Sequence, residues 1–500
     1  MVQYIPHLAE FFLKVDKYRE DKLKFWDKDT FLICIGGDAA PGYDGTSFLV
    51  SFLNVGQRVV SSYENLLSFG AGVKEDSKIV CNYVLKLVHD LKELESHSFG
   101  IMGKDINFRV EAFPNDMKMM AFLAGELTNS AYYFSTFANV STDDVRLVDK
   151  TFSMTSSCDF KPWSYQRRLK DASLAAKKKT LINAKSAAND ETKRHYFTAY
   201  MKSIKSRQEF VPLIGQYVDK AMCEPLHLKN NVVKEVFVKL VFVSLLNPLV
   251  NCKKYAMIPD DHPFKKLVLF VEKKMCCKML SSKLILWFND NVGKKADLKF
   301  RFRGQESFAY LKYFPALVLH LKDLLNDSFH HRLMEVFSVS LYIRLQISLS
   351  TRIHRITLED INIMRENGRL LHNSWAKFYN SVSPSMYTLC LIAPEHTSYY
   401  FVKFGVGLGI NSVEGREQKH QMIVRYKENA PPQDIWSYIF RHEYIHLIYL
   451  RLRGFDEKRH LTTASKYLPP VEDGKCSCSL VLVDSHCPIC DSKLFMSITI

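Results

Sequence analysis

The chain has 500 residues, of which 47% are hydrophobic and 24% charged, and its formal net charge at pH 7 is +15. These values exclude a disordered chain and predict a globular protein of roughly two to four domains. We expect no membrane span, because the most apolar stretch, 233–249, is interrupted by Lys234, Glu235 and Lys239. The basic excess favours a polyanionic partner, most simply a nucleic acid.

The N-terminus and the cysteines indicate an intracellular setting. The opening sequence MVQYIPHLAEFFLKV lacks the basic-then-apolar order of a secretory signal peptide. Of the 12 cysteines, most are isolated and four cluster near the C-terminus. Small secreted domains carry many paired cysteines, so this distribution predicts a reducing compartment and one metal site instead of a disulfide framework.

Strand and helix signals alternate in the first third of the chain. Residues 1–30 show helical periodicity and are predicted to be a short helical lead-in. The order that follows is that of an RNase H-like α/β domain, whose first part we assign to residues 31–144. The predicted elements are strands near 31–37, 47–55 and 66–73, a helix near 77–95, a strand near 106–112, a helix near 116–127 and a strand near 131–138.

An acidic residue follows each of two predicted central strands. Asp38 comes directly after the apolar run FLICIGG, and Asp116 follows the strand 108–112 and a three-residue turn. If the strands are neighbours, the two carboxylates lie close together and repel each other unless a cation separates them. Carboxylate oxygens are the ligands that Mg²⁺ prefers, so the pair predicts a metal site. The structural alternative is an ordinary strand-end aspartate that caps a turn.

A site of this kind needs a third acid, carried by a helix that faces the strand ends. The best candidates lie in NSVEGREQKHQMIVRY, residues 411–426. Glu414 and Glu417 are three residues apart there and share one face of a helix. We assign residues 396–465 to this final helix of the α/β domain and the helices that follow it.

Residues 145–395 are predicted to be a mainly helical, basic insertion. Within it, segment 167–207 is rich in Lys and Arg, and residues 294–303 (KKADLKFRFR) alternate cations with phenylalanine. Both patterns are also typical of ordinary solvated amphipathic elements. The functional interpretation is contact with the phosphates and bases of a nucleic acid. On that interpretation, the candidate contacts of the insertion are Arg167, Arg168, Lys177, Lys178, Lys179, Lys229, Arg301 and Arg303.

The cysteine cluster in residues 466–500 predicts a small zinc-binding segment. Two close pairs, Cys476 with Cys478 and Cys487 with Cys490, are separated by eight residues. Four thiolates complete the tetrahedral coordination of Zn²⁺ and leave no open position, so the site would be structural. Four free thiols are the alternative, and His486 is a reserve ligand.

Residues 442–446 read HEYIH, the pattern of zinc-protease helices. On a helix, His442 and His446 share a face, and Glu443 would serve as the base. The flanking sequence argues against a protease, because the acids that would have to complete the site, Glu457 and Glu472, lie in no predicted helix. We therefore prefer an amphipathic helix over residues 435–452, with a zinc metalloprotease as a remote alternative.

Four motifs occur in a family-specific order along the chain: GGD at 36–38, PNDMKM at 114–119, CEPLHLKNN at 223–231 and VEGREQKH at 413–420. Together they resemble the Transib transposases and the catalytic core of the vertebrate V(D)J recombinase. They are more similar still to transposase-like proteins of cnidarian and other invertebrate genomes. The resemblance covers roughly residues 30–427.

This resemblance implies a transposon-derived DNA transposase or recombinase that cleaves and transfers DNA strands in the nucleus. It implies Asp38, Asp116 and Glu417 as the catalytic acids that hold Mg²⁺ or Mn²⁺, with Glu414 in reserve. It places His227 beside the active site and makes the helical insertion a DNA-binding element. The implied partners are DNA and a second copy of the chain, as a homodimer.

The chain departs from the family at a zinc site. Family members carry a Cys-x-x-Cys after the second Asp and two His before the Glu. Here the cysteine positions match Ser135 and Ala138, and the histidine positions fall near Tyr387 and Ile392. The joint loss of all four ligands predicts apolar packing in place of the metal. It also favours an alternative function, a domesticated and catalytically inactive DNA-binding protein of the same fold.

Overall fold

The computed structural model describes residues 1–39, 45–155, 158–184, 189–249, 252–291, 298, 300–431 and 433–454. Their contacts divide into two compact units. The first unit contains residues 1–225, 352–356 and 395–454, and the second contains residues 226–351 and 357–394. The first unit carries the sheet and all the predicted acids, so it is described first.

The first unit is built on a five-stranded mixed sheet in the order β3-β2-β1-β5-β4. Strands β1 and β5 run parallel, and the remaining neighbours are antiparallel. The sheet confirms the α/β class and the strands predicted near 31–37, 47–55, 66–73 and 106–112. The strands are β1 (Thr30–Ala39), β2 (Thr46–Phe52), β3 (Leu66–Ala71), β4 (Phe99–Ile101) and β5 (Lys104–Ala112).

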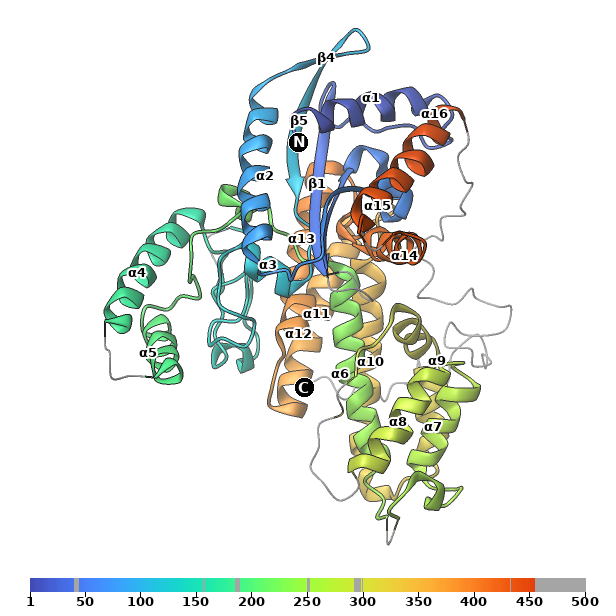
Figure 1. Cartoon of the computed structure of the whole chain (residues 1–500). Helices are drawn as coiled ribbons and strands as arrows, with labels where there is room; N and C mark the ends of the chain where they lie inside the picture. Colours follow the sequence, from blue (N-terminus) through green and yellow to red (C-terminus); the bar gives the residue numbers. More distant parts are fainter. Residues whose placement is uncertain are drawn as a thin grey trace. The chain divides into compact units, whose positions relative to one another are not determined.

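Helices cover both faces of this sheet (Figure 1). Helix α2 (Lys78–Ser96) lies on one face, where the Tyr83 ring is 5.1 Å from that of Phe48 in β2. The next residue of β2, Leu49, packs instead with Ile423 and Ile439 of α14 (Glu414–Glu428) and α15 (Ile435–Glu443). Successive residues of a strand point to opposite faces, so α2 and the α14–α15 pair lie on opposite sides of the sheet.

The N-terminal segment is part of this core, not a separate lead-in. Helix α1 (Tyr4–Asp16) buries Ile5, Leu8 and Phe12, and the Phe12 ring lies 5.5 Å from that of Phe52 at the end of β2. The other helices of the first unit are α3 (Met117–Leu123), α4 (Tyr165–Asn183), α5 (Asp190–Ser203), α13 (Ala393–Phe404) and α16 (Leu450–Leu452).

Two local predictions fail. Residues 131–138 form no strand, and only an isolated bridge joins Tyr133 to Ser141. Their apolar side chains Phe134 and Phe137 are buried in a loop, and burial of that kind gives the same apolar run as a strand. The strand β4 was missed because it has three residues and turns at once through Met102 (φ 50°) and Gly103 (φ 75°).

Every regular element in the described part of the second unit is a helix, as predicted for the middle of the chain. By their contacts, α4 and α5 fall in the first unit, and the second unit begins at residue 226. A buried amide pair, Gln346 Oε1 and Asn367 Nδ2 at 2.9 Å, joins its two longest helices. Its helices are α6 (Pro225–Ser244), α7 (Pro263–Lys273), α8 (Lys278–Asn291), α9 (Gly304–Lys322), α10 (His330–Ser350), α11 (Leu358–Tyr379) and α12 (Pro384–Tyr387).

Candidate metal centre

Asp38 is the last residue but one of β1, and the two glycines before it are needed for packing. A Cβ on Gly36 would lie 1.8 Å from Arg416 Nη1, and one on Gly37 would lie 2.6 Å from the ring of Phe48. The end of β1 therefore packs directly against the side chains of Arg416 and Phe48. Asp38, half-buried, is the first residue beyond this crowded stretch whose side chain has room.

Asp116 is held at the same edge of the sheet. Because β1 and β5 are parallel neighbours, their carboxyl ends meet. The backbone N–H of Gly37 donates to Asn115 Oδ1 at 2.8 Å, which ties the residue before Asp116 to the residue before Asp38. Asp116 Oδ1 also accepts the N–H of Met119 at 2.7 Å and so caps α3.

The Lys118 ammonium pairs with Glu75 and interacts electrostatically with both aspartates. The Lys118 ammonium is 2.5 Å from Glu75 Oε2, and this hydrogen bond is the largest cause that raises the pKa of Lys118. The negative charges of Asp116 and Asp38 raise the same pKa further. The strand ends therefore form an acidic edge with one lysine next to it.

The helix that carries the third acid is fixed closely against the sheet. Gly415 allows the start of α14 to approach the segment that joins β2 to β3, since a Cβ there would lie 2.8 Å from the carbonyl oxygen of Ser61. The next residue, Arg416, is buried and donates to the carbonyl oxygens of Cys34 (3.3 Å) and Pro114 (3.4 Å). Burial lowers the pKa of Arg416, and Glu224 counteracts that effect. These contacts set the rotation of α14 about its axis.

That rotation brings Glu417 and His420 to Asp38. One ligand atom from each of the three residues lies within 4.8 Å of the others. His420 is buried, with Nδ1 4.0 Å from Glu417 Oε2 and Nε2 3.2 Å from Ser47 Oγ. Ser47 is the partner of Asp38 across the β1–β2 register. No other group of three potential ligands was found among the described residues.

The two carboxylates suit Mg²⁺ or Mn²⁺, and the imidazole nitrogen favours the transition metal Mn²⁺ of these two. The described geometry favours Glu417 over Glu414, which lies in the preceding turn and is not in the cluster. His420 was not predicted as a ligand. The sequence feature that could have identified His420 is the spacing Glu417-x-x-His420, which puts both side chains on one helical face.

Two of the predicted DNA contacts, Arg168 and Lys229, are not on the surface. Arg168 is buried in an ion pair with Glu126, and its Nη2 donates to Thr136 O at 2.8 Å. Lys229 is only 2% exposed. The prediction that these two residues contact phosphates is therefore wrong, because a basic run in a sequence does not show which members face inward.

Other members of the predicted DNA surface are accessible. Lys177, Arg301 and Arg303 are exposed, whereas Arg167, Lys178 and Lys179 are half-buried. Arg167 covers the ring of Trp163 at 4.8 Å, and Lys179 pairs with Glu209 at 2.5 Å. His227 lies in α6 of the second unit and is not a member of the acidic cluster.

The HEYIH segment is a helix end packed against the sheet. Residues 435–452 are helical as predicted, with a π-helical turn at Tyr444–Tyr449. Glu443 is buried, pairs with Lys419 at 2.8 Å and accepts the N–H of Leu67 at 3.3 Å. The ring of His442 stacks on Tyr426 at 5.0 Å. A glutamate held by a buried lysine is a poor candidate for a protease base.

Two further predictions concern zinc. Ser135 and Ala138 are fully buried, and Ser135 O accepts the indole N–H of Trp163 at 2.9 Å. Tyr387 and Ile392 are also fully buried, so ordinary packing occupies all four positions. Cys476, Cys478, Cys487 and Cys490 lie outside the described residues, as do Glu457 and Glu472.

Within the described part of the chain, every helix is too short or too polar to cross a bilayer. No protein-family model matches the sequence, and no curated protein matches it.

Proposed function

We propose that this chain is a divalent-metal-dependent DNA strand-cleaving and strand-transferring enzyme of the RNase H-like transposase type. The observation that carries the proposal is the convergence of Asp38, Glu417 and His420, whose ligand atoms lie within 4.8 Å of one another. Glu417 is 379 positions after Asp38 in the sequence (417 − 38). Two carboxylates brought together at a sheet edge repel each other, and a bound cation would offset that repulsion.

The sheet supports the same proposal. Its order β3-β2-β1-β5-β4, with β1 and β5 parallel, has one acid after each of the two parallel strands. An RNase H-like fold with an acid on a later helix is the arrangement that the motif resemblance implies. The helix α14 supplies that acid in this proposal.

In this proposal, the acids and His420 bind metal ions, and the polar residues around them position these ligands or the DNA. Asp38, Glu417 and His420 would hold a Mg²⁺ or Mn²⁺ ion, and Asp116, at the neighbouring strand end, would hold a second. Bound ions of this kind activate a hydroxyl nucleophile and stabilise the charge that develops on a phosphate. Ser47 positions His420 through its hydroxyl, which is 3.2 Å from Nε2. Lys118 would offer its ammonium to the phosphate of the strand.

Binding of DNA rests on charge in this proposal. The net charge of +15 supplies a general attraction to a polyanion. The α4–α5 region concentrates exposed cations on one part of the first unit. They are Lys161, Lys170, Lys177, Arg194, Lys202 and Lys205.

The test is nicking of supercoiled plasmid and of short duplexes with Mg²⁺ or Mn²⁺. We expect Asp38→Asn, Asp116→Asn and Glu417→Gln each to reduce the rate at least a hundredfold, while Glu414→Gln keeps it within about threefold. Nicking that is equal in wild type and Asp38→Asn would refute the proposal. DNA binding without nicking in every protein would favour the inactive DNA-binding alternative.

A further inference from the structure

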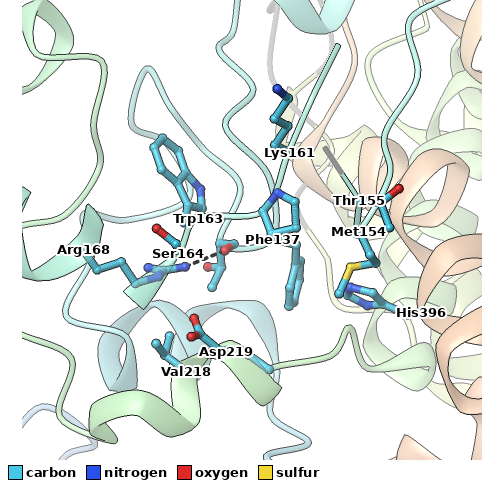
Figure 2. Close-up of a pocket in the computed structure, with 13 residues that line it drawn as sticks. Phe137, Met154, Thr155, Lys161, Trp163, Ser164, Arg168, Val218, Asp219 and His396 are labelled. Atoms are coloured by element: carbon cyan, nitrogen blue, oxygen red, sulfur yellow. Dashed lines mark hydrogen bonds between the residues drawn. The ribbon is translucent and has the colours of Figure 1, made fainter. Parts of the chain in front are cut away.

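The first unit contains a pocket of about 400 Å³ apart from the acidic cluster (Figure 2). Its volume lies in the range of about 300–1,000 Å³ that is typical of small-molecule sites. Phe137, Trp163 and Val218 form part of its lining, and all three are at least nine-tenths buried. Two aromatic rings in one small cavity favour a flat ligand.

A buried histidine supplies this pocket with a hydrogen-bond donor. His396 lines the pocket, is 2% exposed, and its ring lies 5.3 Å from that of Phe137. Its Nδ1 accepts the N–H of Cys223 at 3.0 Å. The neutral ring therefore carries its proton on Nε2, and Nε2 has no hydrogen-bond partner among the described residues. Burial lowers the pKa of His396 to about 3, so the ring stays neutral at physiological pH.

The rim adds an acceptor and a cation. Asp219 is exposed at the pocket, and its carboxylate oxygens are hydrogen-bond acceptors. Lys161 is exposed on the same rim. The ligand would therefore be flat, with donor and acceptor groups on its edge and a negative charge outside the cavity.

We propose that this pocket receives one unstacked nucleobase of a single-stranded DNA segment, with the adjoining phosphate near Lys161. The proposal rests on the proposed function in taking DNA as the partner. A base offers a face to Phe137 and Trp163, ring nitrogens or carbonyl oxygens to the Nε2–H of His396, and N–H groups to Asp219. The exposed cations of α4 and α5 lie in the same unit and suit the flanking phosphates.

The experiment compares a short single-stranded DNA with an oligomer of the same length in which every base is replaced by an abasic site. Both carry the same phosphates, so the ratio of their affinities measures the contribution of the bases alone. Binding is measured by anisotropy in EDTA, which prevents metal-dependent cleavage. We expect the wild-type protein to bind the intact strand about tenfold more tightly.

Two variants localise that advantage to the pocket. Ala221→Leu adds an aliphatic side chain to the lining, and Phe137→Leu removes an aromatic face while keeping apolar volume. We expect the affinity ratio to fall to about one in both, while Ala256→Leu, on an exposed turn of the second unit, keeps the wild-type ratio. A wild-type ratio of one, or an unchanged ratio in both pocket variants, would overturn the proposal.

Free deoxynucleotides and the cleavage assay complete the test. A mononucleotide that removes the base-dependent advantage would support the pocket as the site that binds the base. A protein that shows the pocket-dependent ratio without nicking DNA would refute only the nuclease proposal. One that nicks DNA with a ratio of one would refute only the pocket proposal.

Discussion

At the scale of single residues, the acidic cluster depends on glycines as much as on acids. Gly36 has no space for a side chain, because its Cβ would meet Pro114 O at 2.2 Å as well as Arg416. Arg416 in turn joins α14 to β1 through the carbonyl oxygen of Cys34. Gly36 therefore helps to set where Glu417 lies, because it leaves space for the Arg416 side chain of the same helix.

We expect Gly36→Ala to lower the free energy of unfolding by about 2 kcal/mol or more, because backbone and a buried guanidinium would have to move. Urea unfolding monitored by circular dichroism measures this. Gly100→Ala is the matched control on a strand of the same sheet, since a Cβ there meets nothing within 4 Å. Equal stability of the two variants would contradict the role of Gly36.

A second prediction at this scale concerns His420 as a ligand. We expect His420→Gln to weaken Mn²⁺ binding about tenfold in the absence of DNA, because it removes one of the three ligand groups of the cluster. Electron paramagnetic resonance of free Mn²⁺ gives the dissociation constant. Glu414→Gln serves as the control and should bind as wild type does. Unchanged Mn²⁺ affinity in His420→Gln would remove this residue from the site.

At the scale of elements, α14 carries both the chemistry and the packing of the first unit. Its Lys419 is fully buried and pairs with Glu443 of α15, while burial lowers the pKa of Lys419. Its Ile423 packs with Leu49 and Leu67 of the sheet. The same helix therefore has three faces with different partners: the cluster, a buried ion pair and the apolar core.

We expect Glu443→Gln to destabilise the protein by about 3–5 kcal/mol, because it leaves the Lys419 ammonium buried without its counter-ion. The double variant Lys419→Met with Glu443→Leu should recover most of that loss, since it removes both charges. Thermal or urea unfolding of the wild type, Glu443→Gln and the double variant measures both changes in stability. If Glu443→Gln is as stable as the wild type, the ion pair between Lys419 and Glu443 is not needed for stability.

A helix of the second unit yields a prediction about pH. Burial raises the pKa of Glu235 in α6 to about 7, from an ordinary value of 4.5, although Ser383 and two lysines act in the opposite direction. Between about pH 4.5 and 7, Glu235 therefore keeps its proton in the folded state and has lost it in the unfolded state. Its stabilising contribution is complete below pH 4.5 and is lost as pH rises through 7.

We expect Glu235→Gln to flatten the dependence of stability on pH between about 4.5 and 7. Urea unfolding at a series of pH values in this window measures the slope. Glu359→Gln, at an exposed position in the first turn of α11, is the matched control and should retain the wild-type slope. An unchanged slope in Glu235→Gln would contradict a raised pKa.

At the scale of the whole molecule, charge predicts how the protein should respond to salt. If DNA binds through phosphate contacts, the logarithm of the affinity should fall linearly with the logarithm of the salt concentration. We expect Lys177→Gln to reduce the magnitude of that slope by about one, because Lys177 is exposed on α4. Anisotropy titrations from low to moderate salt provide the slope. Lys104→Gln, exposed at the start of β5, is the control; equal slopes would exclude α4 as a contact.

The sequence by itself determined the parts of the first unit that depend on local pattern. Apolar runs bounded by glycine, proline and polar residues located β1, β2, β3, β5 and α2, since a buried strand or an amphipathic helix imposes its own period. The positions of Asp38 and Asp116 after two of those strands followed from the same signals. Short or irregular segments such as β4 and the loop 131–138 are too short or too irregular to show a hydrophobic periodicity from which they could be predicted.

Only the tertiary structure decided which side chains meet. The pairing of β1 with β5, the choice of Glu417 and the presence of His420 depend on contacts between segments that are distant in the sequence. For α14 the decisive contacts are those of Gly415 with Ser61 and of Arg416 with the carbonyl oxygens of Cys34 and Pro114. The burial of Arg168 and Lys229 and the pocket around His396 were likewise invisible in the sequence. A sequence states which faces of an element are apolar, but the partners of each face are set by packing of the whole chain.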